Sequence, residues 1–193
     1  MYFLFDSVIS TTLNISLLDS LILGAVFYII FLPFTVKKGL QKNIFYLLVF
    51  LYCSFLFFLT IPIVLQPYPE TFLLKFKWAL SEIIWNPFYS VSSIHSTVDL
   101  IKLIGGNFCL LMPISVFQVV SNNKYSWKKI LLIVLSISIG IESLQFIGNI
   151  VIGYSYRTVE LLDLILNVSG AMICFTVFKK VKNSFTAGVR GYK

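Results

Sequence analysis

Residues 44–65 form an uninterrupted apolar run that contains no charged side chain. The length of this run is near the ~20 residues that an α-helix needs to cross the hydrocarbon of a bilayer. Four more such runs cover residues 18–36, 104–120, 130–147 and 161–178. The chain is only 12% charged, whereas soluble domains carry about 25% charged residues. The sequence therefore predicts an all-α, polytopic membrane helical bundle with about five transmembrane helices, forming a single membrane domain over 1–193.

The basic residues predict the orientation of the helices. Most of the 15 lysine and arginine residues follow the first, third and fifth apolar runs. Because cytoplasmic loops are rich in lysine and arginine, this places the N-terminus outside and the C-terminus in the cytoplasm. The net charge of +7 is thus interpreted as a topology signal, and no nucleic-acid partner is expected.

The sequence offers little material for a metal or cofactor site. Cys53, Cys109 and Cys174 each lie in an apolar run, which is typical of small buried side chains. His95 is the single histidine, and no pair of cysteines has the spacing of metal ligands. We expect no metal and no cofactor.

The longest connection, 66–106, contains the segment FLLKFKWALSEIIW with Trp78 and Trp85. Its apolar side chains recur at helical spacing, with charged residues between them: Phe72, Phe76, Ala79 and Ile83. This pattern predicts an amphipathic helix at the outer membrane interface, where indole rings are favoured.

Polar side chains interrupt the last two apolar runs at helical spacing. The fourth run carries Ser138, Glu142, Gln145 and Asn149, and the fifth begins with Glu160, Asp163 and Asn167. Each set lies on one helical face, and the short loop between the two runs predicts that their helices are antiparallel neighbours. Ionisable groups inside a membrane are costly and mark functional sites by default.

Arg157 lies in that loop, and a guanidinium can hold a carboxylate or a phosphate with two hydrogen bonds. Asn107 begins the third run, which Pro113 interrupts, either as a packing kink or as part of the site. The candidate ligand-binding residues are Asn107, Glu142, Gln145, Arg157, Asp163 and Asn167. Two interpretations stay open, namely an ion-pair network that fixes helix packing and a polar pocket, open to the outside, for an anionic or zwitterionic headgroup.

Four segments in this order resemble the VanZ-like family of bacterial membrane proteins. They are IIWNPF, GNFCLLMP, IESLQ and YRTVELLDLILNVSG, and the VanZ-like core covers approximately 83–178. The chain departs from the family pattern at Ser115, where glycine is usual, at Glu160, where aspartate is common, and in the position of Asn86. The resemblance implies a multi-pass protein of the bacterial plasma membrane that acts at the outer leaflet of the cell envelope. The family's named member is associated with low-level resistance to the antibiotic teicoplanin, but the resemblance supplies no reaction.

Three functions remain open at this stage, and whether the chain is an enzyme is not decided. The first is binding of membrane lipids or a lipid-linked cell-wall precursor, which lowers lipoglycopeptide binding to the cell surface. The second is an intramembrane enzyme with Glu142 as general base and Arg157 on the phosphate, and the third is a small lipid transporter or flippase. Small residues on the fifth run also suit helix contacts within the bundle or between the chains of a homo-oligomer.

Overall fold

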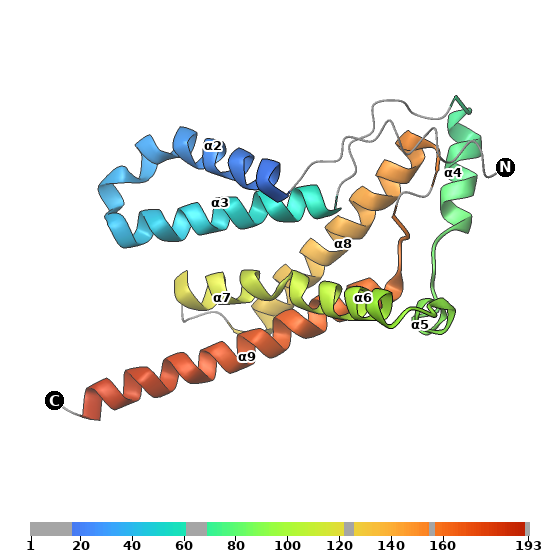
Figure 1. Ribbon diagram of the computed structural model, residues 1–193. Helices are drawn as coiled ribbons and strands as arrows, with labels where there is room; N and C mark the ends of the chain where they lie inside the picture. Colours follow the sequence, from blue (N-terminus) through green and yellow to red (C-terminus); the bar gives the residue numbers. More distant parts are fainter. Residues whose placement is uncertain (1–16, 61–68, 122–125, 155–156, 192–193) are drawn as a thin grey trace. The chain divides into compact units, whose positions relative to one another are not determined.

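The computed structural model describes residues 17–60, 69–121, 126–154 and 157–191. These ranges are helical, and within them the only β-type pairing is an isolated bridge. The elements are α2 (Leu17–Thr35), the 3-10 helix η1 (Val36–Lys38), α3 (Leu40–Thr60), α4 (Phe72–Ser81), α5 (Tyr89–Ser93), α6 (Thr97–Leu110), α7 (Met112–Ser121), α8 (Trp127–Ile152) and α9 (Leu161–Gly191) (Figure 1).

Five helical segments of the described chain are long and apolar enough to cross a membrane, as the hydropathy pattern predicts. They are Leu18–Lys38, Leu40–Phe58, Thr97–Ser121, Trp127–Ile152 and Leu161–Phe185. The predicted amphipathic segment is also helical, but α4 ends at Ser81, before Ile83. Three residues after the end of α4, Ile84 pairs with Glu160 in the isolated bridge.

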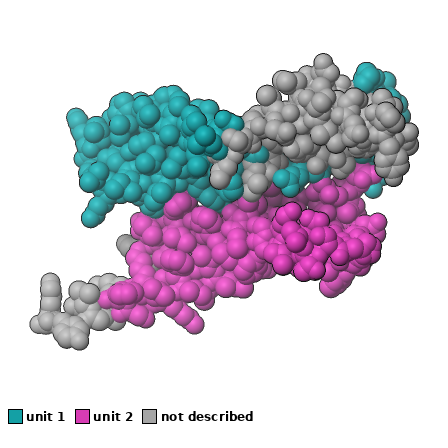
Figure 2. Space-filling view, viewed as in Figure 1, with its two compact units in different colours: residues 1–81, 144–157 teal, residues 82–143, 158–193 magenta. Residues whose placement is uncertain are grey.

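The contacts of the chain fall into two compact units. Unit 1 comprises 1–81 and 144–157, and unit 2 comprises 82–143 and 158–193 (Figure 2). Helix α8 contributes to both, because its first part belongs to unit 2 and its last part to unit 1. The prediction of one membrane domain stays a prediction, and the two units are described separately.

In unit 1, α2 and α3 form a tightly packed hairpin. Gly39, with φ of 91°, makes the turn between them in a conformation that glycine adopts readily. Along the hairpin, the Ser54 hydroxyl donates to the Ser20 carbonyl at 2.7 Å. A Cβ on Gly24 would lie 2.9 Å from the Leu51 Cα, so the close approach of the two backbones requires glycine. Small residues bring membrane helices together in this way.

Helix α4 contacts the last turns of α8 within unit 1. The Lys75 ammonium donates to the Val151 carbonyl at 3.3 Å, and the Phe76 and Phe146 rings meet edge to face with centroids 6.0 Å apart. A cation at the carboxyl end of a helix also interacts favourably with the helix dipole. Gly153, with φ of 87°, then ends α8.

In unit 2, α9 packs along α6 and α7 (Figure 1). The third span is interrupted as Pro113 predicts, because α6 ends at Leu110 and α7 begins at Met112. Proline is tolerated in a first helical turn but removes a backbone donor from a helix interior. The Ser115 hydroxyl donates to the Ala171 carbonyl at 2.7 Å and ties α7 to α9.

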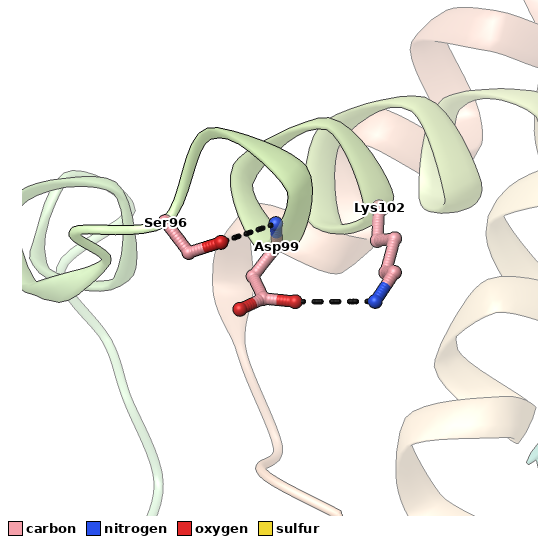
Figure 3. Close-up of polar contacts among 3 residues, drawn as sticks. All are labelled: Ser96, Asp99 and Lys102. Atoms are coloured by element: carbon pink, nitrogen blue, oxygen red, sulfur yellow. Dashed lines mark hydrogen bonds and ion pairs between the residues drawn. The ribbon is translucent and has the colours of Figure 1, made fainter.

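Helix α6 begins with a capped first turn (Figure 3). The Ser96 hydroxyl accepts a hydrogen bond from the Asp99 backbone N–H at 3.4 Å, and the Asp99 carboxylate pairs with Lys102 at 3.2 Å. Both side chains of this ion pair are exposed, so its contribution to stability is small. Asp99 is therefore an exposed acidic residue that can serve as a control for substitutions of the buried Glu142.

We predict that Gly170→Ala destabilises unit 2, because a Cβ there would lie 2.7 Å from the Phe108 carbonyl carbon and closer still to its oxygen. Overpacking of this kind costs about 1–3 kcal/mol. Gly140→Ala is the matched control, since a Cβ on that helical glycine meets nothing within 4 Å. Thermal unfolding in detergent should show a lower midpoint for Gly170→Ala alone, and equal midpoints would contradict the close contact of α6 with α9.

Candidate polar site

The position of Glu160 is set by backbone pairing. The Ile84 N–H donates to the Val159 carbonyl at 3.0 Å, and the Leu161 N–H donates to the Ile84 carbonyl at 3.1 Å. These two bonds form the bridge between Ile84 and Glu160, immediately before α9 begins. The carboxylate of Glu160 is thereby placed inside unit 2, where its side chain is only 8% exposed.

Ser90 in the short helix α5 provides the first partner of Glu160. Its hydroxyl donates to the Glu160 Oε2 in a short hydrogen bond. Asn86 positions α5, because its Oδ1 accepts from the Phe88 N–H and its carbonyl accepts from the Tyr89 N–H, both at 3.1 Å. Such asparagine turns are a common local alternative to regular structure. The segment IIWNPF therefore places a buried hydroxyl on the carboxylate.

Glu142 in α8 provides the second contact. Its Oε2 accepts a hydrogen bond from the Glu160 backbone N–H at 3.2 Å, so two acidic residues are in contact. Glu142 is 9% exposed. In the part of the chain that the structure describes, neither Glu142 nor Glu160 forms an ion pair. Two neighbouring buried carboxylates without a cation need a proton or a positively charged ligand.

Two further polar pairs join α9 to its neighbours in unit 2. The Asn107 side chain in α6 donates to Asp163 in a short hydrogen bond. The Asn167 side-chain amide donates to the Ser138 hydroxyl of α8 at 3.1 Å. Asn167 is 1% exposed, and its Oδ1 has no hydrogen-bond partner. Helix α8 thus meets α9 through polar side chains, whereas the long packing of α9 is against α6 and α7.

The remaining two predicted site residues lie in unit 1. Arg157 is exposed, and Asn149 holds its backbone, with Nδ2 donating to the Arg157 carbonyl at 2.7 Å and Oδ1 accepting from its N–H at 3.4 Å. Gln145 is buried, and its Oε1 has no partner. Pairing of Arg157 with Glu142 stays a prediction, because the two residues belong to different units.

The sequence indicates Glu142 as a candidate but not the residues that contact it. Ser90 carries no distinguishing pattern, because it is one serine among several in a polar loop. Glu160 belongs to the polar stripe of the fifth run, but the sequence gives no sign of its contact with Glu142. His95 is exposed and lies outside the site. Within the described ranges, no three histidine, cysteine or acidic side chains gather as ligands for a metal ion.

Fold and site together define a multi-pass helical membrane protein with a buried, acidic polar cluster. The family model of VanZ/LLP1 matches residues 20–183. The chain therefore belongs to the VanZ/LLP1 family, as the four segments predict. No match was found among curated proteins or among solved structures.

Removal of the Ser90 hydroxyl should destabilise the fold, because it leaves the buried Glu160 carboxylate without its donor. The expected cost of Ser90→Ala is about 1–3 kcal/mol. Ser92→Ala is the control from the same helix, since Ser92 is exposed and bonds only the nearby Tyr89 carbonyl. Thermal unfolding in detergent measures the difference, and a Ser90→Ala midpoint equal to that of Ser92→Ala would argue against a buried Ser90–Glu160 bond.

Proposed function

We propose that this VanZ-family protein binds a lipid-linked or amphiphilic molecule at the outer leaflet of the bacterial plasma membrane, and thereby lowers the binding of lipoglycopeptides to the cell surface. The observation that carries the proposal is the contact of Glu142, Glu160 and Ser90. These three buried polar groups come from α8, the start of α9 and α5. Their assembly at one place exceeds what the packing of apolar helices requires.

The cost of such an assembly in a membrane supports a functional role. A carboxylate in a transmembrane helix is retained against a desolvation penalty of several kcal/mol. Glu142 lies ten residues before the end of α8 at Ile152, roughly 15 Å along the helix at 1.5 Å per residue. A glutamine or leucine at this position would span the membrane more easily. Retention of two carboxylates therefore favours a role in binding.

The distribution of charge supports the outer location. The basic loops after the first, third and fifth spans favour an orientation with the N-terminus outside and the C-terminus in the cytoplasm. In that orientation the start of α9 and the α5 segment face the outside. Membrane lipids or a lipid-linked wall precursor would then reach the site laterally from the outer leaflet. The candidate ligand-binding residues Asn107, Glu142, Asp163 and Asn167 would line it in unit 2.

The test compares wild type with Glu142→Gln, expressed at matched levels in a susceptible Gram-positive host. Wild type should lower both teicoplanin susceptibility and the binding of a fluorescent lipoglycopeptide to the cells. Glu142→Gln should abolish both effects, because the variant keeps the shape of the side chain but loses its charge. Asp99→Asn is the matched control, since it makes the same acid-to-amide change at an exposed residue.

The three strains distinguish a binding site from a packing residue. Full activity in Glu142→Gln would show that the charge of Glu142 is not needed and would contradict the proposal. Loss of activity in both variants would point to a general effect of removing acidic groups. Membrane levels of each variant must be equal for either conclusion.

A second function, an intramembrane enzyme acting on a lipid or wall precursor, is favoured by one observation. The Ser90 hydroxyl donates to the Glu160 carboxylate, which is the arrangement of a nucleophile beside a general base. An enzyme would produce a lipid species in extracts of wild-type cells that is missing from cells expressing Ser90→Ala. Identical mass spectra of the two lipid extracts would exclude Ser90 as a nucleophile.

A further inference from the structure

We infer that one end of unit 2, which we name the basic end, binds the headgroups of anionic phospholipids. The basic end consists of the last turn of α7, the first turn of α8 and the last third of α9. It goes beyond the proposed function, because it lies at the opposite end of α9 from Glu160. The described chain carries five lysines there, namely Lys128, Lys129, Lys179, Lys180 and Lys182.

Hydrogen bonds within unit 2 show that these helix ends lie together. The Ser115 hydroxyl donates to the Ala171 carbonyl, and further along both helices the Lys182 ammonium donates to the Val119 carbonyl in a short hydrogen bond. Helices α7 and α9 therefore run in the same direction, and the last turn of α7 lies beside the lysines of α9. Because only residues 122–126 separate α7 from α8, the first turn of α8 must lie near the same place.

The basic end carries an excess of positive charge. The sequence contains no aspartate or glutamate in residues 20–69, 100–141 or 164–193. These ranges include the connections after the first and third spans and everything that follows the fifth span, so neither unit has an acidic side chain in those connections. An anion from outside the chain is the natural partner of such an excess of charge.

The length of α9 places the basic end at the level of lipid headgroups. From Glu160, just before α9, to Lys180 is roughly 30 Å at 1.5 Å per residue, which equals the thickness of the hydrocarbon core of a bilayer. The lysines would thus lie at the membrane surface opposite Glu160. Clusters of lysine at the cytoplasmic ends of membrane helices attract anionic lipids.

Apolar side chains among the lysines favour a lipid over a soluble anion. Trp127 precedes Lys128, and Phe178 precedes Lys179; both rings are exposed, as is Phe185 further along α9. A phospholipid presents an acyl chain directly beside its phosphate, so it can contact the ring and the ammonium together. A soluble phosphate would use the lysines alone and would leave the rings without a partner.

The experiment measures lipid binding to the purified full-length protein in detergent micelles by native mass spectrometry. The two probes are phosphatidylglycerol and phosphatidylcholine with the same acyl chains, so they differ in headgroup charge. We expect phosphatidylglycerol to bind more than about tenfold more tightly, and we expect the difference to shrink as salt is added. Equal affinity for the two lipids would overturn the inference.

Two exposed lysines from different helices, Lys128 and Lys180, assign the effect to the basic end. The double variant Lys128→Gln with Lys180→Gln should lose most of the preference, since each lysine near an anionic surface contributes about fivefold. Replacement of the same two residues by arginine keeps both charges and should keep the preference. Lys182 is left unchanged, because it also ties α9 to α7.

The matched control is the double variant Lys37→Gln with Lys42→Gln. It removes the same charge from two exposed lysines beside the connection after the first span, in unit 1. We expect this variant to keep the preference for phosphatidylglycerol. An equal loss in both glutamine variants would show that only the net charge of the protein matters, and it would contradict a binding surface at the basic end.

Discussion

The pairing of Ile84 with the two residues that flank Glu160 is the contact from which the rest of the polar site is built. It brings the chain between α4 and α6 against the start of α9. Because Ser90 lies close to Ile84 in the sequence, its hydroxyl reaches the Glu160 carboxylate. The same pairing presents the Glu160 N–H to Glu142. One short stretch of β-type hydrogen bonding thus organises the buried polar groups of three helices.

The helices were predictable from the sequence, but the partners of the buried carboxylates were not. Apolar runs of membrane length predict spans because a lipid-exposed backbone must form its hydrogen bonds internally, and Pro113 predicts the break between α6 and α7. The end of α4 at Ser81 was not predictable, since the helical pattern of the sequence continues to Ile83. The contact of Ser90 was not predictable either, because it depends on a hydrogen bond to Glu160, 70 positions away in the sequence.

The structure adds contacts of Glu142 that the sequence does not indicate. On the outer side of the predicted topology, Arg157 is the candidate cation nearest to Glu142 and suggests a salt bridge or a phosphate site. In the structure, Asn149 holds the backbone of Arg157, and within unit 2 the Glu142 carboxylate accepts a hydrogen bond from the backbone N–H of a second acidic residue, Glu160. The contacts of Glu142 within unit 2 could not be read from the sequence, because they depend on a backbone pairing between residues far apart in the chain.

The hydrogen-bond partners of the polar side chains distinguish the residues that hold helices together from the residues of the proposed binding site. Lipid supplies no hydrophobic force between helices, so close backbone contact and hydrogen bonds hold them together. Ser54, Ser115 and Lys182 each donate to a main-chain carbonyl of a neighbouring helix, and such bonds serve packing. Glu142 and Glu160 differ, because the Glu160 backbone N–H and the Ser90 hydroxyl bring two acidic side chains to one place in unit 2. Burial of two acidic side chains adds a desolvation cost that helix packing does not require, and the proposed binding function accounts for that cost.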